Sequence, residues 1–181
     1  MSVRPLVVSF VGPSGVGKTT VIESLVAALA ARGLRVGTAK HAPHGFQVDR
    51  EGSDSWRHRA AGAERVLLMG SASAVVFLGA PEDGSGGDHH RSSSPVDADR
   101  MVELLDAQMS SMDVVLVEGF APFSDRVVVV ERSTVEPKVD LVPVDVWLTV
   151  SDRGDGGDDG SFGFDELDRL VVRLVDERNS A

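Results

Sequence analysis

The segment GPSGVGKTT, residues 12–20, constrains this chain more than any other feature. Residues 12–19 match the pattern G-x-x-x-x-G-K-[ST] without a gap. The segment PLVVSFV before it is apolar and β-branched, which is typical of a strand buried on both faces. Residues 18–31 after it carry apolar side chains at helical spacing, and Gly33 predicts the end of that helix. The sequence therefore predicts a strand, a phosphate-binding loop and a helix in direct succession.

The composition of the loop indicates how it binds a phosphate. Glycines allow the backbone to curl so that successive N–H groups point inward, and the following helix presents its positive dipole end to the same anion. Lys18 is placed to reach the β- and γ-phosphates, and the Thr19 hydroxyl to bind Mg²⁺. A plain glycine-rich turn would explain the glycines but neither of these side chains. The candidate nucleotide-binding residues are Gly12, Pro13, Ser14, Gly15, Val16, Gly17, Lys18, Thr19 and Thr20.

Such a loop needs an acidic residue near the magnesium, at the end of a neighbouring buried strand. Glu118 directly follows the apolar run DVVLV, so we expect it at the carboxyl end of that strand, where ligands bind in open parallel sheets. The alternative is an ordinary glutamate at a strand end. Asp49 and Asp54 are further candidates for holding a metal or positioning water, and either could equally cap a helix or lie in solvent.

The residue that recognises the base is less clearly marked. The chain lacks the tetrapeptide N/T-K-x-D, in which an aspartate accepts the N1 and N2 protons of guanine. Asp152 follows the run LTVS in the corresponding region, so it is a candidate for that role or a simple turn residue. Lys40 ends the predicted strand 34–40 and could counter phosphate charge or lie in solvent.

The remaining sequence alternates predicted strands and helices. This alternation predicts an α/β fold, a three-layer sandwich with a mainly parallel sheet, of the P-loop NTPase type. We expect one domain over residues 1–181, with a flexible excursion at 81–95 and an acidic, glycine-rich loop at 152–161. Further strands are predicted at 64–70, 73–79, 112–120, 125–132 and 144–150, and further helices from Ser53 or Asp54 through residue 63, at 97–110 and at 164–178.

Composition excludes several classes of function. The formal net charge is −10, which disfavours sequence-independent nucleic-acid binding. The chain has no cysteine, so it has no disulfide, thiolate nucleophile or cysteine-based metal site. No apolar run approaches the ~20 residues that a bilayer span needs, and the first residues do not resemble a signal peptide. We expect a soluble cytoplasmic protein with no membrane or nucleic-acid partner.

Three motifs together resemble the molybdopterin-guanine dinucleotide biosynthesis protein B (MobB) family. They are the loop GPSGVGKTT, the segment KHAPHGFQVDREGSDSWRHRAAGA at 40–63, and DVVLVEGFAPF at 113–123. The middle segment is the distinctive one, with a Lys-His start and a D-S helix leading to A-G-A. The resemblance covers most of residues 5–150.

The resemblance implies a Mg²⁺-dependent GTP-binding adaptor with weak GTPase activity, usually a homodimer. Such proteins act beside the nucleotidyltransferase that attaches GMP to molybdopterin to form molybdopterin guanine dinucleotide. By motif match, Gly12 to Thr20 form the phosphate loop, Asp49 is a switch or metal acid, and Glu118 is the acid on the magnesium strand. The residues expected to act in hydrolysis are thus Lys18, Glu118 and Asp49, and those expected at the metal are Thr19, Glu118 and Asp49.

A small-molecule kinase on the same scaffold is the alternative. Kinases commonly use a mobile, arginine-bearing lid that excludes water from the transfer. Arg91, within the excursion at 81–95, is the one candidate for such an arginine. A nucleotide-bound scaffold without turnover is a third possibility.

Overall fold

The computed structural model describes most of the chain as two compact units. Met1–His41 and Ser93–Ala181 form the first unit, and Ala42–Ser92 form the second. The described residues are 4–41, 48–63, 65–70, 73–78, 95–121, 124–136, 145–153 and 160–180. Most of the predicted excursion at 81–95, including Arg91, and most of the acidic loop at 152–161 therefore lie outside the described residues.

A six-stranded sheet forms the centre of the first unit, and each pair of neighbouring strands in it is parallel. The prediction of an α/β fold with a mainly parallel sheet is confirmed. The sequence did not predict the last strand, because three residues are too few to show a period. In spatial order the strands are β2 (Val36–Lys40), β5 (Val114–Glu118), β1 (Leu6–Val11), β6 (Arg126–Glu131), β7 (Leu148–Ser151) and β8 (Ser161–Gly163).

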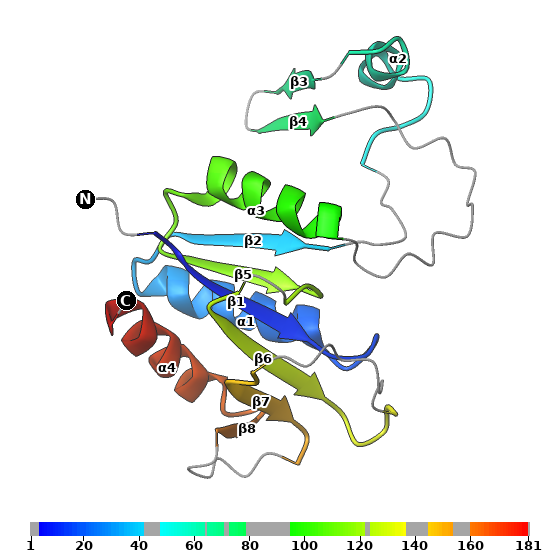
Figure 1. Ribbon diagram of the computed structural model, residues 1–181. Helices are drawn as coiled ribbons and strands as arrows, with labels where there is room; N and C mark the ends of the chain where they lie inside the picture. Colours follow the sequence, from blue (N-terminus) through cyan, green and yellow to red (C-terminus); the bar gives the residue numbers. More distant parts are fainter. Residues whose placement is uncertain are drawn as a thin grey trace. The chain divides into compact units, whose positions relative to one another are not determined.

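Helices cover both faces of this sheet, which gives the predicted three layers (Figure 1). On one face, α1 (Lys18–Ala31) and α4 (Leu167–Ser180) pack on the side chains at alternate positions of β1, such as Val8 and Phe10. On the other face, α3 (Pro95–Met109) packs through Leu105 on Val115 and Val117 of β5. In β1, the run predicted to be buried on both faces, Val8 and Phe10 are buried on one face, and Ser9 and Val11 on the other.

The strand order brings the polar strand ends together at one edge of the sheet. Phe10 of β1 and Lys40 of β2 are both in register with Glu118 of β5, so these strands end at the same level. On the other side of β1, Val11 is in register with Val129 of β6. The loop that follows β1 thus begins between the carboxyl ends of β5 and β6.

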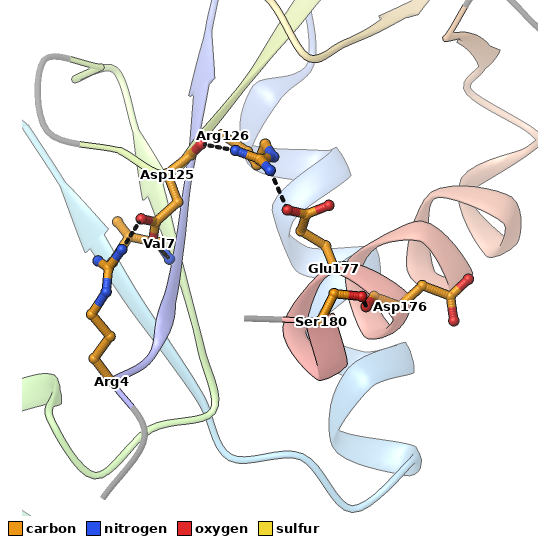
Figure 2. A network of polar contacts seen from close by, with 7 residues as sticks. All are labelled: Arg4, Val7, Asp125, Arg126, Asp176, Glu177 and Ser180. Carbon is orange, nitrogen blue, oxygen red and sulfur yellow. Dashed lines mark hydrogen bonds and ion pairs between the residues drawn. The ribbon is translucent and has the colours of Figure 1, made fainter.

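A polar network ties the opposite edge of the sheet to α4 (Figure 2). The Asp125 carboxylate accepts hydrogen bonds from the Val7 backbone N–H at 2.8 Å and from the Arg4 guanidinium at 2.5 Å. Arg126 donates to the Asp125 carbonyl at 2.7 Å and forms an ion pair with Glu177 of α4. These contacts fix the start of β6 beside the start of β1 and join both to α4.

The second unit contains the short helix α2 (Asp54–Ala60) and a hairpin of β3 (Arg65–Met69) and β4 (Ala74–Leu78). Ser53 caps α2 by accepting the Trp56 N–H at 3.2 Å, as predicted for this position. No large apolar side chain is buried among the described residues of the second unit. Several large apolar side chains lie exposed on its hairpin. No helix in the described parts of either unit is long and apolar enough to span a bilayer.

Candidate nucleotide-binding site

The loop between β1 and α1 has the curled backbone that its glycines allow. Gly12 has a φ of 147°, and a Cβ built there would lie 2.2 Å from the Val130 carbonyl oxygen. Gly17, immediately before α1, has a φ of 104°, which also favours glycine. Pro13 and Val16 are buried while Ser14 and Gly15 are exposed. The loop is therefore anchored at its sides and open at its tip.

Lys18 folds back over this loop. Its Nζ donates to the carbonyl oxygens of Gly12 at 2.8 Å and Pro13 at 2.7 Å. Since an ammonium has three donors and a flexible stem, it can exchange such carbonyls for phosphate oxygens without a change in the backbone. Its place at the start of α1, where unpaired N–H groups and the helix dipole favour anions, suits a phosphate.

Thr19 and Glu118 meet beside Lys18, as the pattern of strand ends predicts. The Thr19 hydroxyl donates to Glu118 Oε2 at 3.0 Å, and Lys40 Nζ lies 3.3 Å from Glu118 Oε1. Mg²⁺ prefers one or two protein oxygens together with phosphate oxygens and water. The Thr19 hydroxyl and the Glu118 carboxylate fit that preference. Among the described residues, no group of three or more acidic or histidine side chains could hold a metal ion.

Asp152, the candidate base-recognising residue, lines a pocket of about 180 Å³ that also reaches the loop at Pro13 and Val16. Its carboxylate accepts the Ser133 N–H at 2.9 Å and the Ser133 hydroxyl at 2.6 Å. These hydrogen bonds lower the pKa of Asp152, so the group is ionised at neutral pH. An ionised carboxylate retains lone pairs that can accept the two protons on the edge of guanine.

Arg132 lines the same pocket and is not among the residues predicted from the sequence. It immediately follows β6, and its Nε donates to the Val16 carbonyl at 3.0 Å. The rule that identified Glu118, a charged residue at the carboxyl end of an apolar strand, applies equally to the run VVVVER. Ser133, which orients Asp152, carries no comparable pattern.

Asp49 and Asp54 belong to the second unit. Asp49 Oδ1 accepts the hydroxyls of Ser53 and Ser55, each at 2.9 Å, and Oδ2 lies 3.5 Å from the Arg59 guanidinium. Burial by itself raises the pKa of Asp49, but the hydrogen bonds from these neighbours outweigh it, so the pKa is lowered. Asp49 thus organises the N-terminus of α2, while Asp54 is exposed in its first turn.

Comparison with known proteins assigns this chain to one family. The family model described as "MobB: Molybdopterin guanine dinucleotide synthesis protein B" matches residues 7–152. The molybdopterin-guanine dinucleotide biosynthesis adapter protein of Haemophilus influenzae is 38% identical over 109 residues, which are 60% of this chain and 53% of that protein. The protein of the same description from Escherichia coli is 33% identical over 112 residues, 62% of this chain and 57% of its own. The matched region thus spans little more than half the length of these relatives.

Solved structures agree at the level of the fold. The crystal structure of Bacillus subtilis MobB is 27% identical, covers 96% of this chain and 97% of its own, and superposes with a TM-score of 0.61. With 96% of this chain covered, the match extends past residue 152, where the family model ends, into the C-terminal helix α4.

Proposed function

From the premise that this chain belongs to the MobB family, we propose that it is a GTP-binding adaptor of molybdenum cofactor biosynthesis. In this proposal it assists the attachment of GMP to molybdopterin, which forms molybdopterin guanine dinucleotide. It binds GTP with Mg²⁺ and hydrolyses it slowly. Its relatives from Haemophilus influenzae and Escherichia coli bear the description of adapter proteins of this biosynthesis.

The convergence of Lys18, Thr19 and Glu118 at one edge of the sheet carries the proposal. Lys18 supplies an ammonium to the terminal phosphates, and Thr19 with Glu118 would hold the magnesium. A bound Mg²⁺ would neutralise phosphate charge as the terminal phosphoryl group leaves. The chain's own contribution is to position the phosphates through the loop N–H groups and to orient the metal-binding carboxylate through Lys40.

The preference for GTP over ATP rests on Asp152. Its ionised carboxylate can accept two protons from guanine, whereas adenine presents an acceptor at the corresponding ring nitrogen. Ser133 holds this carboxylate within the pocket that begins at the phosphate loop. The pocket is therefore proposed to receive the base.

We also propose the remaining partners on the strength of family membership. They are a second copy of this chain, molybdopterin or its guanine dinucleotide, and the nucleotidyltransferase of the same pathway, all in the cytoplasm. Asp49 stays a proposed switch or metal acid, although its described contacts serve α2. The kinase alternative depends on Arg91, which lies outside the described residues.

Calorimetric titration with GTP, GDP and ATP, each with and without Mg²⁺, tests the proposal. The unaltered protein should bind Mg²⁺-GTP more tightly than Mg²⁺-ATP and turn it over far more slowly than once per second. Lys18→Ala should weaken GTP binding by roughly ten- to a hundredfold, because a charged hydrogen bond contributes ~1.5–3 kcal/mol. Glu118→Gln should remove most of the advantage that Mg²⁺ gives.

Glu23→Gln is the matched control, since Glu23 is an exposed glutamate on α1. It should bind GTP as the unaltered protein does. Asp49→Asn is titrated alongside, and unchanged Mg²⁺-GTP binding and turnover would withdraw Asp49 from the metal and hydrolysis. Tight ATP binding with indifferent GTP binding would contradict the proposed nucleotide.

A further inference from the structure

Arg132 contacts the phosphate loop through the backbone of the loop. Where the N–H groups of a loop turn inward around a phosphate, its carbonyl groups turn outward. Arg132 Nε donates to one such carbonyl, that of Val16, at 3.0 Å. Val16 itself is completely buried, so this hydrogen bond joins the end of β6 to the anchored part of the loop.

The Arg132 guanidinium is held on a second side by Phe164, which follows β8. The guanidinium carbon lies 4.6 Å from the centre of the Phe164 ring. Both side chains also border Gly17: a Cβ built there would lie 3.4 Å from Phe164 Cε1 and 3.6 Å from Arg132 Nη2. Arg132 is exposed as a residue, so these contacts, rather than burial, fix its position.

Lys18 and Arg132 therefore contact the loop in different ways. Lys18 Nζ must leave the carbonyls of Gly12 and Pro13 to reach a phosphate. Arg132 already meets the loop through a directional N–H donor and a planar face, which an ammonium cannot reproduce. Ligand affinity falls in proportion to the fraction of protein that is binding-competent, so a contact that keeps the loop curled raises affinity without touching the ligand.

We propose that Arg132 is a positioning residue that holds the phosphate loop in its binding-competent curl through the Val16 carbonyl and the Phe164 ring. Its planar guanidinium, not its charge alone, is what the loop requires. The consequence for nucleotide affinity rests on the proposed GTP-binding function; the effect on the loop itself does not.

Two measurements on Arg132→Lys and Arg132→Met test this inference. Without any ligand, the backbone amides of residues 15–18 should exchange with solvent about five- to tenfold faster in both variants, the range that a hydrogen bond of ~1–1.5 kcal/mol gives. The affinity for GTP and the affinity for inorganic tripolyphosphate should also fall about five- to tenfold in both variants, because both ligands need the curled loop. Phe164→Leu should act in the same direction with a smaller effect.

Arg173→Met is the matched control, because Arg173 on α4 also lies over an aromatic ring, 6.0 Å from the centre of Trp147, and does not line the pocket. It should leave loop exchange and both affinities unchanged. Arg132→Lys that behaves as the unaltered protein would show that charge suffices and overturn the inference. So would a loss of GTP affinity with tripolyphosphate affinity retained, or a lower melting temperature with unchanged loop exchange. Failure of the unaltered protein to bind GTP would refute the proposed function but leave the exchange result decisive for Arg132.

Discussion

At the scale of single residues, Gly12 shows how closely the phosphate loop approaches the sheet. A methyl group there would meet the Val130 carbonyl oxygen at 2.2 Å, and the φ of 147° is unfavourable for any other residue. We expect Gly12→Ala to lower the free energy of unfolding by about 3 kcal/mol, since β1 or β6 must shift to accommodate it. Chemical denaturation monitored by tryptophan fluorescence measures this.

Gly33 provides the comparison that separates backbone conformation from crowding. Its φ of 82° is also positive, but a Cβ there would meet no atom within 4 Å. Gly33→Ala should therefore cost only about 1 kcal/mol, from the left-handed conformation alone. Equal losses in the two variants would mean that the contact with Val130 is relieved at no cost.

At the scale of elements, Asp113 joins three segments at the edge of the sheet opposite the phosphate loop. Its carboxylate accepts the Arg35 N–H at 2.8 Å just before β2, and lies 3.5 Å from Arg178 in the last turn of α4. The backbone and side-chain hydrogen bonds from Arg35 lower the pKa of Asp113. Because the ionised form is stabilised in the folded state, this contribution is present above the unfolded-state pKa of 3.8 and is lost as the pH falls below it.

Asp113→Asn should therefore lower the free energy of unfolding by about 1 kcal/mol at pH 7. The difference from the unaltered protein should shrink as the pH falls below 3.8, because the aspartate becomes protonated first in the unfolded state and then in the folded state. Denaturation curves across this range measure the effect. Asp106→Asn, at an exposed position of α3, is the control and should show no such trend. A difference that grows on acidification would contradict the assigned sign.

At the scale of the whole molecule, the hairpin of the second unit offers a surface for the proposed homodimer. Leu67 and Val76 face each other across β3 and β4 and are 61% and 55% exposed. Met69, on the same face, is 73% exposed. A cluster of exposed aliphatic side chains on a two-stranded sheet is more typical of an interface than of free surface.

We expect light scattering to give twice the chain mass of 19.2 kDa for the unaltered protein and the single mass for Leu67→Glu. A buried carboxylate at the interface would be costly to desolvate, so the dimer should dissociate. Val172→Glu, at an exposed apolar position on α4, should stay dimeric. A monomeric unaltered protein would refute the dimer, and a dimeric Leu67→Glu variant would place the interface elsewhere.

A feature could be predicted from the sequence where residues close together in the chain determine it. The phosphate loop and the helix after it were accessible because consecutive residues determine them. Glu118 could be placed beside Thr19 because the carboxyl ends of parallel strands share one edge. The site roles of these residues, and of Asp152 and Asp49, remain predictions.

The sequence by itself determined the α/β class, the curled loop after β1 and the burial of β1 on both faces. These features depend on glycine conformation and hydrophobic patterning, which are properties of consecutive residues. Only the tertiary structure decided the strand order, the separate second unit and the contacts of Arg132 with Val16 and Phe164. Arg132 and Val16 are separated by 116 residues. No periodicity links residues so far apart, because their contact follows from which strands pair in the sheet.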